Sequence, residues 1–257
     1  ALTGTVAANA QAGGFVDDAS ASLQLRNFYF NRDFRDPGAQ SKAEEWAQGF
    51  IFKAESGFTE GFIGFGVDVY AGLGVKLDSA DERAGSGLLP NGYGNEGPDS
   101  YSEATAAGKL RLSKSVLKVG GLMPKLPVVS SGDLRLLPQE FTGASLAVNE
   151  IEDLDLQGGQ LREVNYRNST NSEDIRATVG GSADRFNYPC GNYSFNSGNT
   201  KVGLWGAELQ DVYEQTLFNL IHNQPIGDWM LGANLAYFDT GDNGRQSLDI
   251  DHQMKSL

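Results

Sequence analysis

The chain has 257 residues with a formal net charge of −13, and 40% of its residues are hydrophobic. This acidic balance argues against nucleic acid as a partner, because a phosphate-binding surface needs an excess of bases. No apolar run approaches the roughly 20 residues of a membrane-spanning helix, so a helical membrane protein is excluded. A β-barrel stays possible, because barrel strands give only a weak and dispersed hydropathy signal.

Residues 1–14 are small and polar, and we expect this terminus to be mobile or loosely docked. The opening sequence ALTGTVAANA is typical of a mature end left after a signal segment is cleaved, which fits an exported protein.

Alternation begins at residue 19. Leu23 and Leu25 fall on one face of the predicted strand, whereas Gln24 and Arg26 fall on the other. A loop and a second strand near 45–54 follow. In a soluble sandwich the apolar face would meet a core, and in a barrel it would meet lipid.

Residues 63–77 give the clearest strand. Its length of about fifteen residues exceeds the usual five or six of a soluble strand, which favours a tilted barrel strand. Four glycines share the inward face and leave room for something pressed against the wall from inside. The two predicted faces are Ile63, Phe65, Val67, Val69, Ala71, Leu73, Val75 and Leu77 outward, and Gly64, Gly66, Asp68, Tyr70, Gly72, Gly74, Lys76 and Asp78 inward.

A long polar loop over 79–101 leads to a strand that ends near 112, with Lys109 and Arg111 inward. A tight turn at 113–115 then leads into a short strand, with Lys118 inward. Long and short connections at opposite ends are expected of outer-membrane barrels.

The stretch 122–141, LMPKLPVVSSGDLRLLPQEF, is too long and too rich in Pro, Gly and Ser for a hairpin turn. Pro124, Pro127 and Pro138 exclude a regular helix and a central strand. Because nine of its residues are apolar, it is predicted to fold against other parts of the protein. One interpretation is a surface loop packed on its own side chains, and the other is a loop folded into a barrel lumen.

The remaining chain repeats the alternating pattern. Trp229 and Tyr237 flank the apolar face of the last clear strand, as expected of an aromatic girdle. In total we predict about eleven strands and the start of a twelfth near Ile250. Those after the long stretch lie over 143–149, 154–159, 186–195, 201–212, 214–223 and 229–237.

LMPKLPV at 122–128 and RLLPQEF at 135–141 together resemble the constriction loop of the OprD-type substrate-specific porins of Gram-negative outer membranes. Other segments agree in order along the chain, namely LQLRNFYFNRDF (23–34), KAEEWAQGF (42–50), GFGVDVYAGLGVKLDS (64–79), GLLP (87–90), YRNST (166–170), ELQDVYEQ (208–215) and PIGDWMLGANLAYFD (225–239).

This resemblance implies an all-β fold, a transmembrane antiparallel barrel of about 18 strands in the bacterial outer membrane. Residues 1–257 would then be the N-terminal portion of a single barrel domain, with 122–141 as the inward-folded constriction loop. Eleven or twelve strands alone leave two unpaired edges, so we expect the chain to be part of a longer protein.

The resemblance also implies a passive channel for small carboxylates. Neither a cofactor nor a metal is expected, and the partners would be carboxylate solutes, outer-membrane lipid and lipopolysaccharide, with a monomer or loose trimer as the assembly. At Lys125 members of the family often carry an acid, so the eyelet here is expected to be more positive, or Lys125 points elsewhere. The implied pore-lining residues are Arg26, Lys109, Arg111, Lys125, Asp133, Arg135 and Arg167.

Two other function classes stay open. A soluble all-β binding module, similar to a carbohydrate-binding sandwich, would expose its inward bases to solvent. An outer-membrane hydrolase would need a Ser or Asp beside a His, and His222 is the serious candidate, although a structural role fits it better. The single Cys190 is predicted to be a free thiol in a bend, and Asp239-Thr240-Gly241 a loop tip rather than an aspartic-protease triplet.

Overall fold

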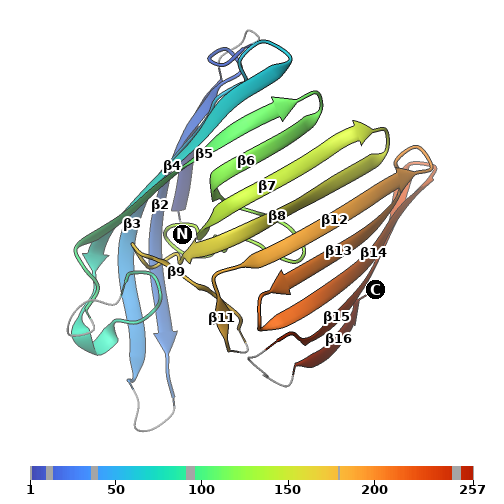
Figure 1. The fold of residues 1–257 in the computed structure, drawn as a ribbon. Coiled ribbons are helices and arrows are strands. Elements are labelled where there is room, and N and C mark those ends of the chain that lie inside the picture. The colour runs from blue at the N-terminus through green and yellow to red at the C-terminus, as the bar shows by residue number, and fades with distance from the viewer. Residues whose placement is uncertain are drawn as a thin grey trace.

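The structure, a computed structural model, describes residues 2–9, 14–35, 40–90, 96–178, 180–244 and 250–256, with side chains from residue 14 onward. It is dominated by one sheet of fourteen strands, in which β9 (Ser172–Glu173) lies off the main path against β8 (Figure 1). Neighbouring strands pair antiparallel in chain order. The main path runs through β1 (Leu2–Asn9), β2 (Ser20–Asp33), β3 (Lys42–Glu55), β4 (Ile63–Asp78), β5 (Ser100–Leu112), β6 (Ser115–Leu122), β7 (Glu140–Ile151), β8 (Leu154–Asn165), β12 (Phe186–Phe195), β13 (Thr200–Leu209), β14 (Tyr213–Ile226), β15 (Trp229–Asp242) and β16 (Asp251–Ser256).

Three small elements lie outside this sheet. β10 (Ile175–Arg176) pairs with β11 (Ser182–Ala183), and η1 (Asp81–Arg83) is a single 3₁₀ turn in the connection between β4 and β5. Across the described ranges, none of the chain forms a helix that is long and apolar enough to span a membrane.

Every strand predicted from the alternation is present, as β2–β8 and β12–β16, which confirms the all-β antiparallel prediction. The prediction of a loosely docked terminus is wrong for Leu2–Asn9, which forms β1 and pairs with β2 from Asn27 back to Ser20. The reason is that β2 would otherwise offer a row of unpaired N–H and C=O groups, which any extended segment can fill whatever its side chains.

The two faces of β4 differ as predicted. Phe65 is 56% exposed and Val67 is 36% exposed, whereas Tyr70 on the opposite face is 5% exposed. β2 behaves in the same way, with Leu23 and Leu25 exposed and Arg26 buried. The outward face of the wall is therefore apolar and exposed, whereas polar groups gather on the inward face.

Connections are short at one end of the sheet. The tight turns after β5, β7 and β14 place Ser113, Asp153 and Gly227 at φ values of 53°, 62° and 59°. Left-handed backbone of this kind matches the right-handed twist of paired strands. The opposite end carries the long loops 79–99, 123–139 and 166–185, and also the three-residue connection 210–212 between β13 and β14.

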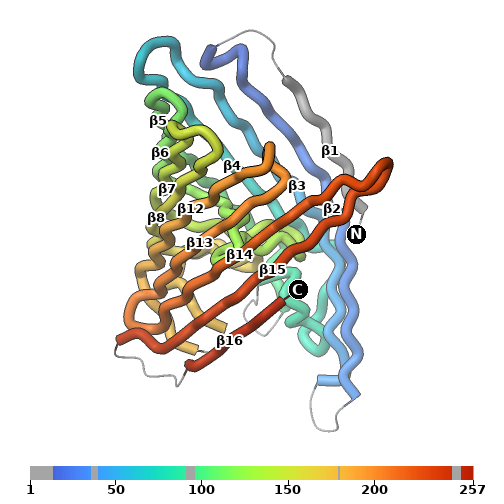
Figure 2. The backbone as a smooth tube through the Cα atoms, turned by 90° about the vertical axis from the view of Figure 1, so that its right-hand side faces the viewer, coloured from blue at the N-terminus to red at the C-terminus, as the bar shows by residue number. Residues whose placement is uncertain are grey.

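The sheet curves, and β1 and β16 form its two edges (Figure 2). Loop 123–139 lies in the hollow of the curve, between β2–β3 on one side and β6–β8 on the other. The buried apolar cores lie on the inner wall, where strand residues pack with loop residues. One core joins Leu88 and Leu89 of loop 79–99 with Leu136 and Leu137, on Ala47, Ile51, Tyr70 and Tyr101.

Candidate functional site on the inner face of the sheet

Loop 123–139 has its own internal hydrogen bonds. The Ser131 amide donates to the Pro124 carbonyl at 2.8 Å, and the Gln139 amide donates to the Gly132 carbonyl at 2.7 Å. A tighter turn forms where the Leu126 amide donates to the Val129 carbonyl at 2.9 Å. These bonds satisfy backbone groups that the prolines prevent from joining the sheet.

Leu136 and Leu137 attach this loop to the wall. Both are 0% exposed. A Cβ added to Gly49 would lie 3.2 Å from Leu136 Cδ1, one at Gly74 would lie 2.9 Å from Leu136 Cδ2, and one at Gly72 would lie 3.1 Å from Leu137 Cδ1. The absence of side chains at these glycines therefore makes room for the leucines. At Gly74 and Gly72 it also makes room for Tyr101 Cε1 and the Tyr70 hydroxyl, which would lie 2.3 and 2.5 Å from an added Cβ. Complete burial stabilises the docked loop by about 1.5–3 kcal/mol per leucine.

The other two inward glycines of β4 receive a different segment. A Cβ at Gly64 would lie 3.0 Å from Phe58 Cβ, and one at Gly66 would lie 2.7 Å from the Gly57 carbonyl oxygen. The connection between β3 and β4 thus also folds over the inner wall. The four glycines divide into two pairs, with one pair for each of two segments.

Arg26 on β2 reaches into the same loop. Its Nη1 donates to Asp133 Oδ1 and to the Arg135 carbonyl oxygen, both at 2.6 Å. Arg26 is 7% exposed, and the Asp133 side chain is 44% exposed. The guanidinium therefore fixes the position of the loop segment that carries Asp133 and Arg135.

Arg135 belongs to a group of arginines near the long-loop end. Its guanidinium carbon lies 4.5 Å from the centroid of the Phe30 ring, and that of Arg32 lies 5.5 Å from the same centroid. Burial lowers the pKa of Arg135, and the positive charges of Arg167 and Arg32 lower it further. Arg167 and Arg135 make no ion pair within the described ranges, so their charges are available to an anion.

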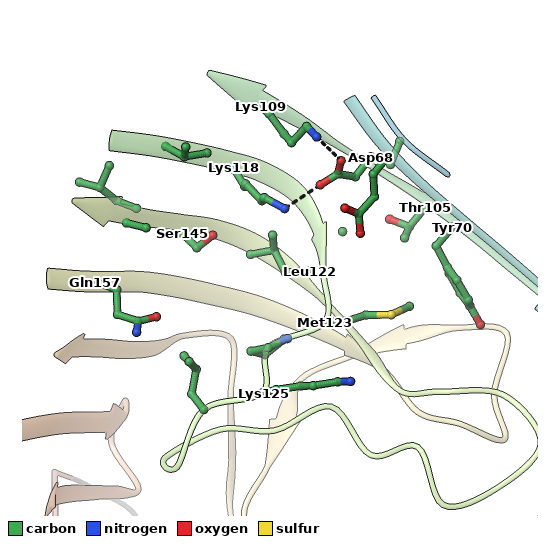
Figure 3. A pocket seen from close by; sticks show the side chains of 18 of the residues that line it. Asp68, Tyr70, Thr105, Lys109, Lys118, Leu122, Met123, Lys125, Ser145 and Gln157 are labelled. Carbon is green, nitrogen blue, oxygen red and sulfur yellow. Dashed lines mark hydrogen bonds and ion pairs between the residues drawn. The ribbon is translucent and has the colours of Figure 1, made fainter. Parts of the chain in front are cut away.

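A hollow of about 620 Å³ lies beside the loop, over β4–β8 (Figure 3). Its basic side chains are Lys53, Lys109, Lys118 and Lys125, and its acids are Glu55 and Asp68. Its apolar surface comes from Phe58, Leu122, Met123, Leu126 and Tyr188. The hollow therefore offers both positive charge and apolar contact.

Asp68 joins two of the lysines. Lys109 Nζ lies 2.6 Å from Asp68 Oδ1, and Lys118 Nζ lies 2.7 Å from Asp68 Oδ2 (Figure 3). Lys109 also donates to the Ser56 carbonyl at 2.7 Å. All of these residues except Ser56 come from inward positions of β4, β5 and β6, where the alternation places them.

Two further predicted site residues, Arg111 and Lys125, lie near the Asp68–Lys109–Lys118 group. Arg111 lies over the Phe58 ring at 4.7 Å and near Gly64. Lys125 is exposed at the hollow. The structure thus brings Lys109 and Lys125 to one hollow, groups Arg26, Asp133 and Arg135 at the loop, and places Arg111 nearer the short turns.

Sequence reasoning missed several groups in this region. It did not select Lys53 or Arg32, and it gave Asp68 no role beyond its inward direction. Lys76, another inward base, instead holds loop 79–99 through ion pairs of 2.8 Å to Glu96 and 2.9 Å to Asp99. The alternation of each strand was the signal that would have found Lys53 and Asp68.

The sequence reasoning also missed two buried acids, Glu45 and Glu103. Glu45 is 1% exposed and accepts hydrogen bonds from the amide and hydroxyl groups of Ser86. Glu103 is 6% exposed and accepts a hydrogen bond from the Tyr70 hydroxyl. These contacts hold loop 79–99 and brace neighbouring strands, so they support the wall.

The other residues that the sequence singled out, His222, Cys190 and Asp239-Thr240, lie within strands of the wall. The His222 ring nitrogen Nδ1 lies 2.8 Å from the buried Thr200 Oγ1 on the neighbouring strand. The predicted bend at Cys190 is wrong, because Cys190 lies within β12 and pairs with Gln157 and Trp205. Asp239 and Thr240 are in β15 rather than at a loop tip, because that strand continues to Asp242.

A long antiparallel sheet with an apolar outer face, a polar inner face and a loop docked on that inner face defines the porin class of outer-membrane β-proteins. The family model described as "outer membrane porin, OprD family" matches residues 13–257. The chain belongs to the OprD family of outer-membrane porins, whose members are outer-membrane proteins. The proteins of this family are channels rather than enzymes, and membership does not favour the soluble binding module.

Individual relatives agree with this family assignment. The porin-like protein GalP of Pseudomonas putida is 46% identical over 246 residues, which cover 95% of this chain and 60% of GalP. The crystal structure of Pseudomonas aeruginosa OccK9 (OpdG) superimposes with a TM-score of 0.90 at 48% identity, covering 95% of this chain and 64% of OccK9. A BenF-like porin from Pseudomonas fluorescens Pf-5 gives a TM-score of 0.89 at 44% identity, covering 93% of this chain and 63% of that porin. The chain thus spans about three fifths of the length of these relatives.

Proposed function

We propose that this protein is a passive, substrate-selective diffusion channel for small carboxylate-bearing nutrients. In this proposal residues 1–257 form part of one barrel domain, and residues 122–141 are its constriction loop. The observation that carries the proposal is the set of basic side chains on the inner face, on both sides of the docked loop. The chain as a whole is strongly acidic, so this concentration of bases on the inner wall is local.

The bases are arranged along a path. Arg32 lies near the end of β2 where the long loops begin, and Arg135 and Arg167 are close to it. Lys109 and Lys118 lie three residue pairs from the tight turn at the opposite end, which is expected to face the periplasm. A carboxylate entering from the long-loop end would therefore meet arginines first and the lysines of the hollow next.

The two groups of bases suit different steps. Arginine remains charged and grips a carboxylate through two parallel donors, which orients the solute at the loop. Lysine is a compact charge on a flexible stem and suits a solute that must move on. The apolar surface of the hollow, which includes Leu122, Met123 and Tyr188, would contact the body of the solute. Conduction needs attraction for entry and weak enough binding for exit.

Related structures support this substrate class. OpdK of Pseudomonas aeruginosa, 42% identical to this chain, was solved with vanillate, and OccK2 (OpdF) of the same organism, 41% identical, was solved in complex with glucuronate. Both ligands carry a carboxylate. We infer the same class of solute for this chain, with the proposed pore-lining residues Arg26, Lys109, Arg111, Lys125, Asp133, Arg135 and Arg167. Contact with lipid and lipopolysaccharide, and a monomeric or loosely trimeric assembly, belong to the same proposal.

The test is the ion selectivity of the intact porin in a planar bilayer. One unit charge at about 4 Å in an effective dielectric of about 20 is worth roughly 4 kcal/mol before desolvation is subtracted. If about a quarter of this survives, Arg135→Ala should lower the preference for anions by about fivefold to tenfold. The reversal potential in a salt gradient and the uptake of a labelled carboxylate measure this change.

Arg176→Ala is the matched control, because Arg176 lies in loop 166–185 and is already paired with Glu173. It should leave both readouts at wild-type values. A wild-type porin without anion preference would refute the carboxylate channel, and an Arg135→Ala variant identical to wild type would remove Arg135 from the constriction.

A further inference from the structure

Lys109 and Lys118 lie directly opposite each other on β5 and β6, on the inward face. Like charges in such cross-strand positions repel. Asp68, from the next strand, places one carboxylate oxygen on each ammonium, at 2.6 and 2.7 Å (Figure 3). The wall therefore contains a two-lysine carboxylate site that is occupied by a carboxylate of the chain itself.

The two lysines are held unequally. Lys109 has a 6% exposed side chain, donates to the Ser56 carbonyl at 2.7 Å and lies over the Phe58 ring. Lys118 has a 38% exposed side chain, and Asp68 is its one ion-pair partner within the described ranges. Replacement of the Asp68 carboxylate by another anion is therefore easier at Lys118 than at Lys109.

We propose that Asp68 acts as a resident competitor, a specificity-determining residue that occupies the carboxylate position of the hollow and gives up Lys118 to an entering carboxylate. This inference rests on the proposed function and goes beyond it, because it assigns the weak binding of the carboxylate solute to the action of one residue. During exchange Asp68 keeps Lys109 while the solute takes Lys118, so neither ammonium is left without a counter-ion. Return of Asp68 to Lys118 then expels the solute.

The rest of the hollow supports such an exchange. Lys53 and Lys125 line the same space and make no ion pair within the described part of the chain, so they can attract the entering anion. The second acid of the hollow, Glu55, is exposed and lies at the end of β3. A solute carboxylate at Lys118 therefore stays within a basic surrounding.

The test uses acetate as the probe and the reactivity of Lys118 as the readout. The detergent-solubilised intact porin is treated with an amine-labelling reagent at increasing acetate concentration, and labelling of Lys118 is measured by mass spectrometry. Asp68→Asn keeps the shape of the side chain and removes its charge. We expect acetate to protect Lys118 at an about threefold to tenfold lower concentration in Asp68→Asn than in wild type. Equal concentrations, or no protection in either protein, would overturn the inference.

Asp78→Asn is the matched control, because Asp78 is also on β4 but pairs with Arg83 outside the hollow. It should leave protection of Lys118 unchanged, and an equal shift there would mean that net charge alone is responsible. If Asp68→Asn does not yield folded protein, Lys118→Gln carries the test through the reversal potential in a potassium acetate gradient. A lower acetate preference is expected, and an unchanged value would overturn the proposal.

Labelling and conduction separate the two proposals. A wild-type porin without anion preference in the bilayer would reject the carboxylate channel, whatever the labelling shows. An anion-selective wild type with no shift in acetate protection on Asp68→Asn would reject only the role of Asp68.

Discussion

Arg26→Met is predicted to release the loop segment around Asp133 and Arg135 while keeping the wall intact. Methionine retains most of the buried stem but has no guanidinium. Arg26 Nη1 makes two bonds of 2.6 Å to the loop, one to the Asp133 carboxylate and one to the Arg135 carbonyl. A hydrogen bond to a charged group contributes about 1.5–3 kcal/mol, and the bond to Asp133 counts for less because that side chain is half exposed.

Together the two bonds should contribute about 2–3 kcal/mol to docking of this segment. Their loss should raise the population of the released segment by about 30-fold to 160-fold. Leu136 and Leu137 stay buried, so the root of the loop should remain docked. Hydrogen exchange of the Ser131 and Gln139 amides, both bonded within the loop, should accelerate accordingly. Single-channel current should also become noisier and larger.

Arg32→Met is the control, since Arg32 lies on the same strand, stacks on Phe30 and makes no ion pair within the described ranges. It should leave amide exchange in the loop unchanged. If Arg26→Met exchanged within about twofold of wild type at both amides, the assigned contribution of Arg26 would be refuted.

Spin labels at Val67 and Asp68 should differ in accessibility to a lipid-soluble quencher, because these neighbours face opposite sides of β4; equal accessibility would contradict the two-faced wall. Gly74→Val should displace Tyr101, whose Cε1 would lie 2.3 Å from the new Cβ, and Leu136, whose Cδ2 would lie 2.9 Å from it. The substitution should therefore destabilise the packing of the loop on the wall by about 1–3 kcal/mol in chemical denaturation, whereas outward Gly108→Val should have little effect. The hydrogen bond from Lys76 holds the pKa of Asp99 below its usual value. The contribution of the Lys76–Asp99 pair to holding loop 79–99 should therefore be complete above the ordinary carboxyl range. It should be lost only as pH falls through the lowered pKa of Asp99. Limited proteolysis of the loop against pH measures this, and release already at the ordinary carboxyl pKa would contradict it.

Much of the wall was predictable because alternation is a local property. The direction of Asp68 and Lys109 follows from the period of two along β4 and β5. The opposition of Lys109 and Lys118 did not follow from the predicted turn at 113–115, because Ser115 already pairs with Leu112 and the turn that fixes the register has two residues. The strand β1 was not predictable, because its pairing fills an edge through backbone groups that carry no side-chain pattern.

The contacts between distant segments could not be derived in this way. Asp68 reaches the lysines only after the long loop between β4 and β5 has returned the chain in the correct register. The Arg26–Asp133 pair joins residues 107 positions apart, and no periodicity relates them. Thus the sequence predicts which residues face inward, but not which inward residues share a partner.

The glycines opposite Leu136 and Leu137 have a consequence for engineering. Gly49 and Gly74 receive Leu136, and Gly72 receives Leu137, so part of the volume that wall side chains would fill is supplied by another segment. Transplanting residues 122–141 into a different porin would therefore require these three β3 and β4 positions to be transferred with it. A recipient that carries Val or Leu at any of them would hold the transplanted segment away from its wall, and the aperture of the chimera would then depend on the recipient's strands rather than on the donor's loop.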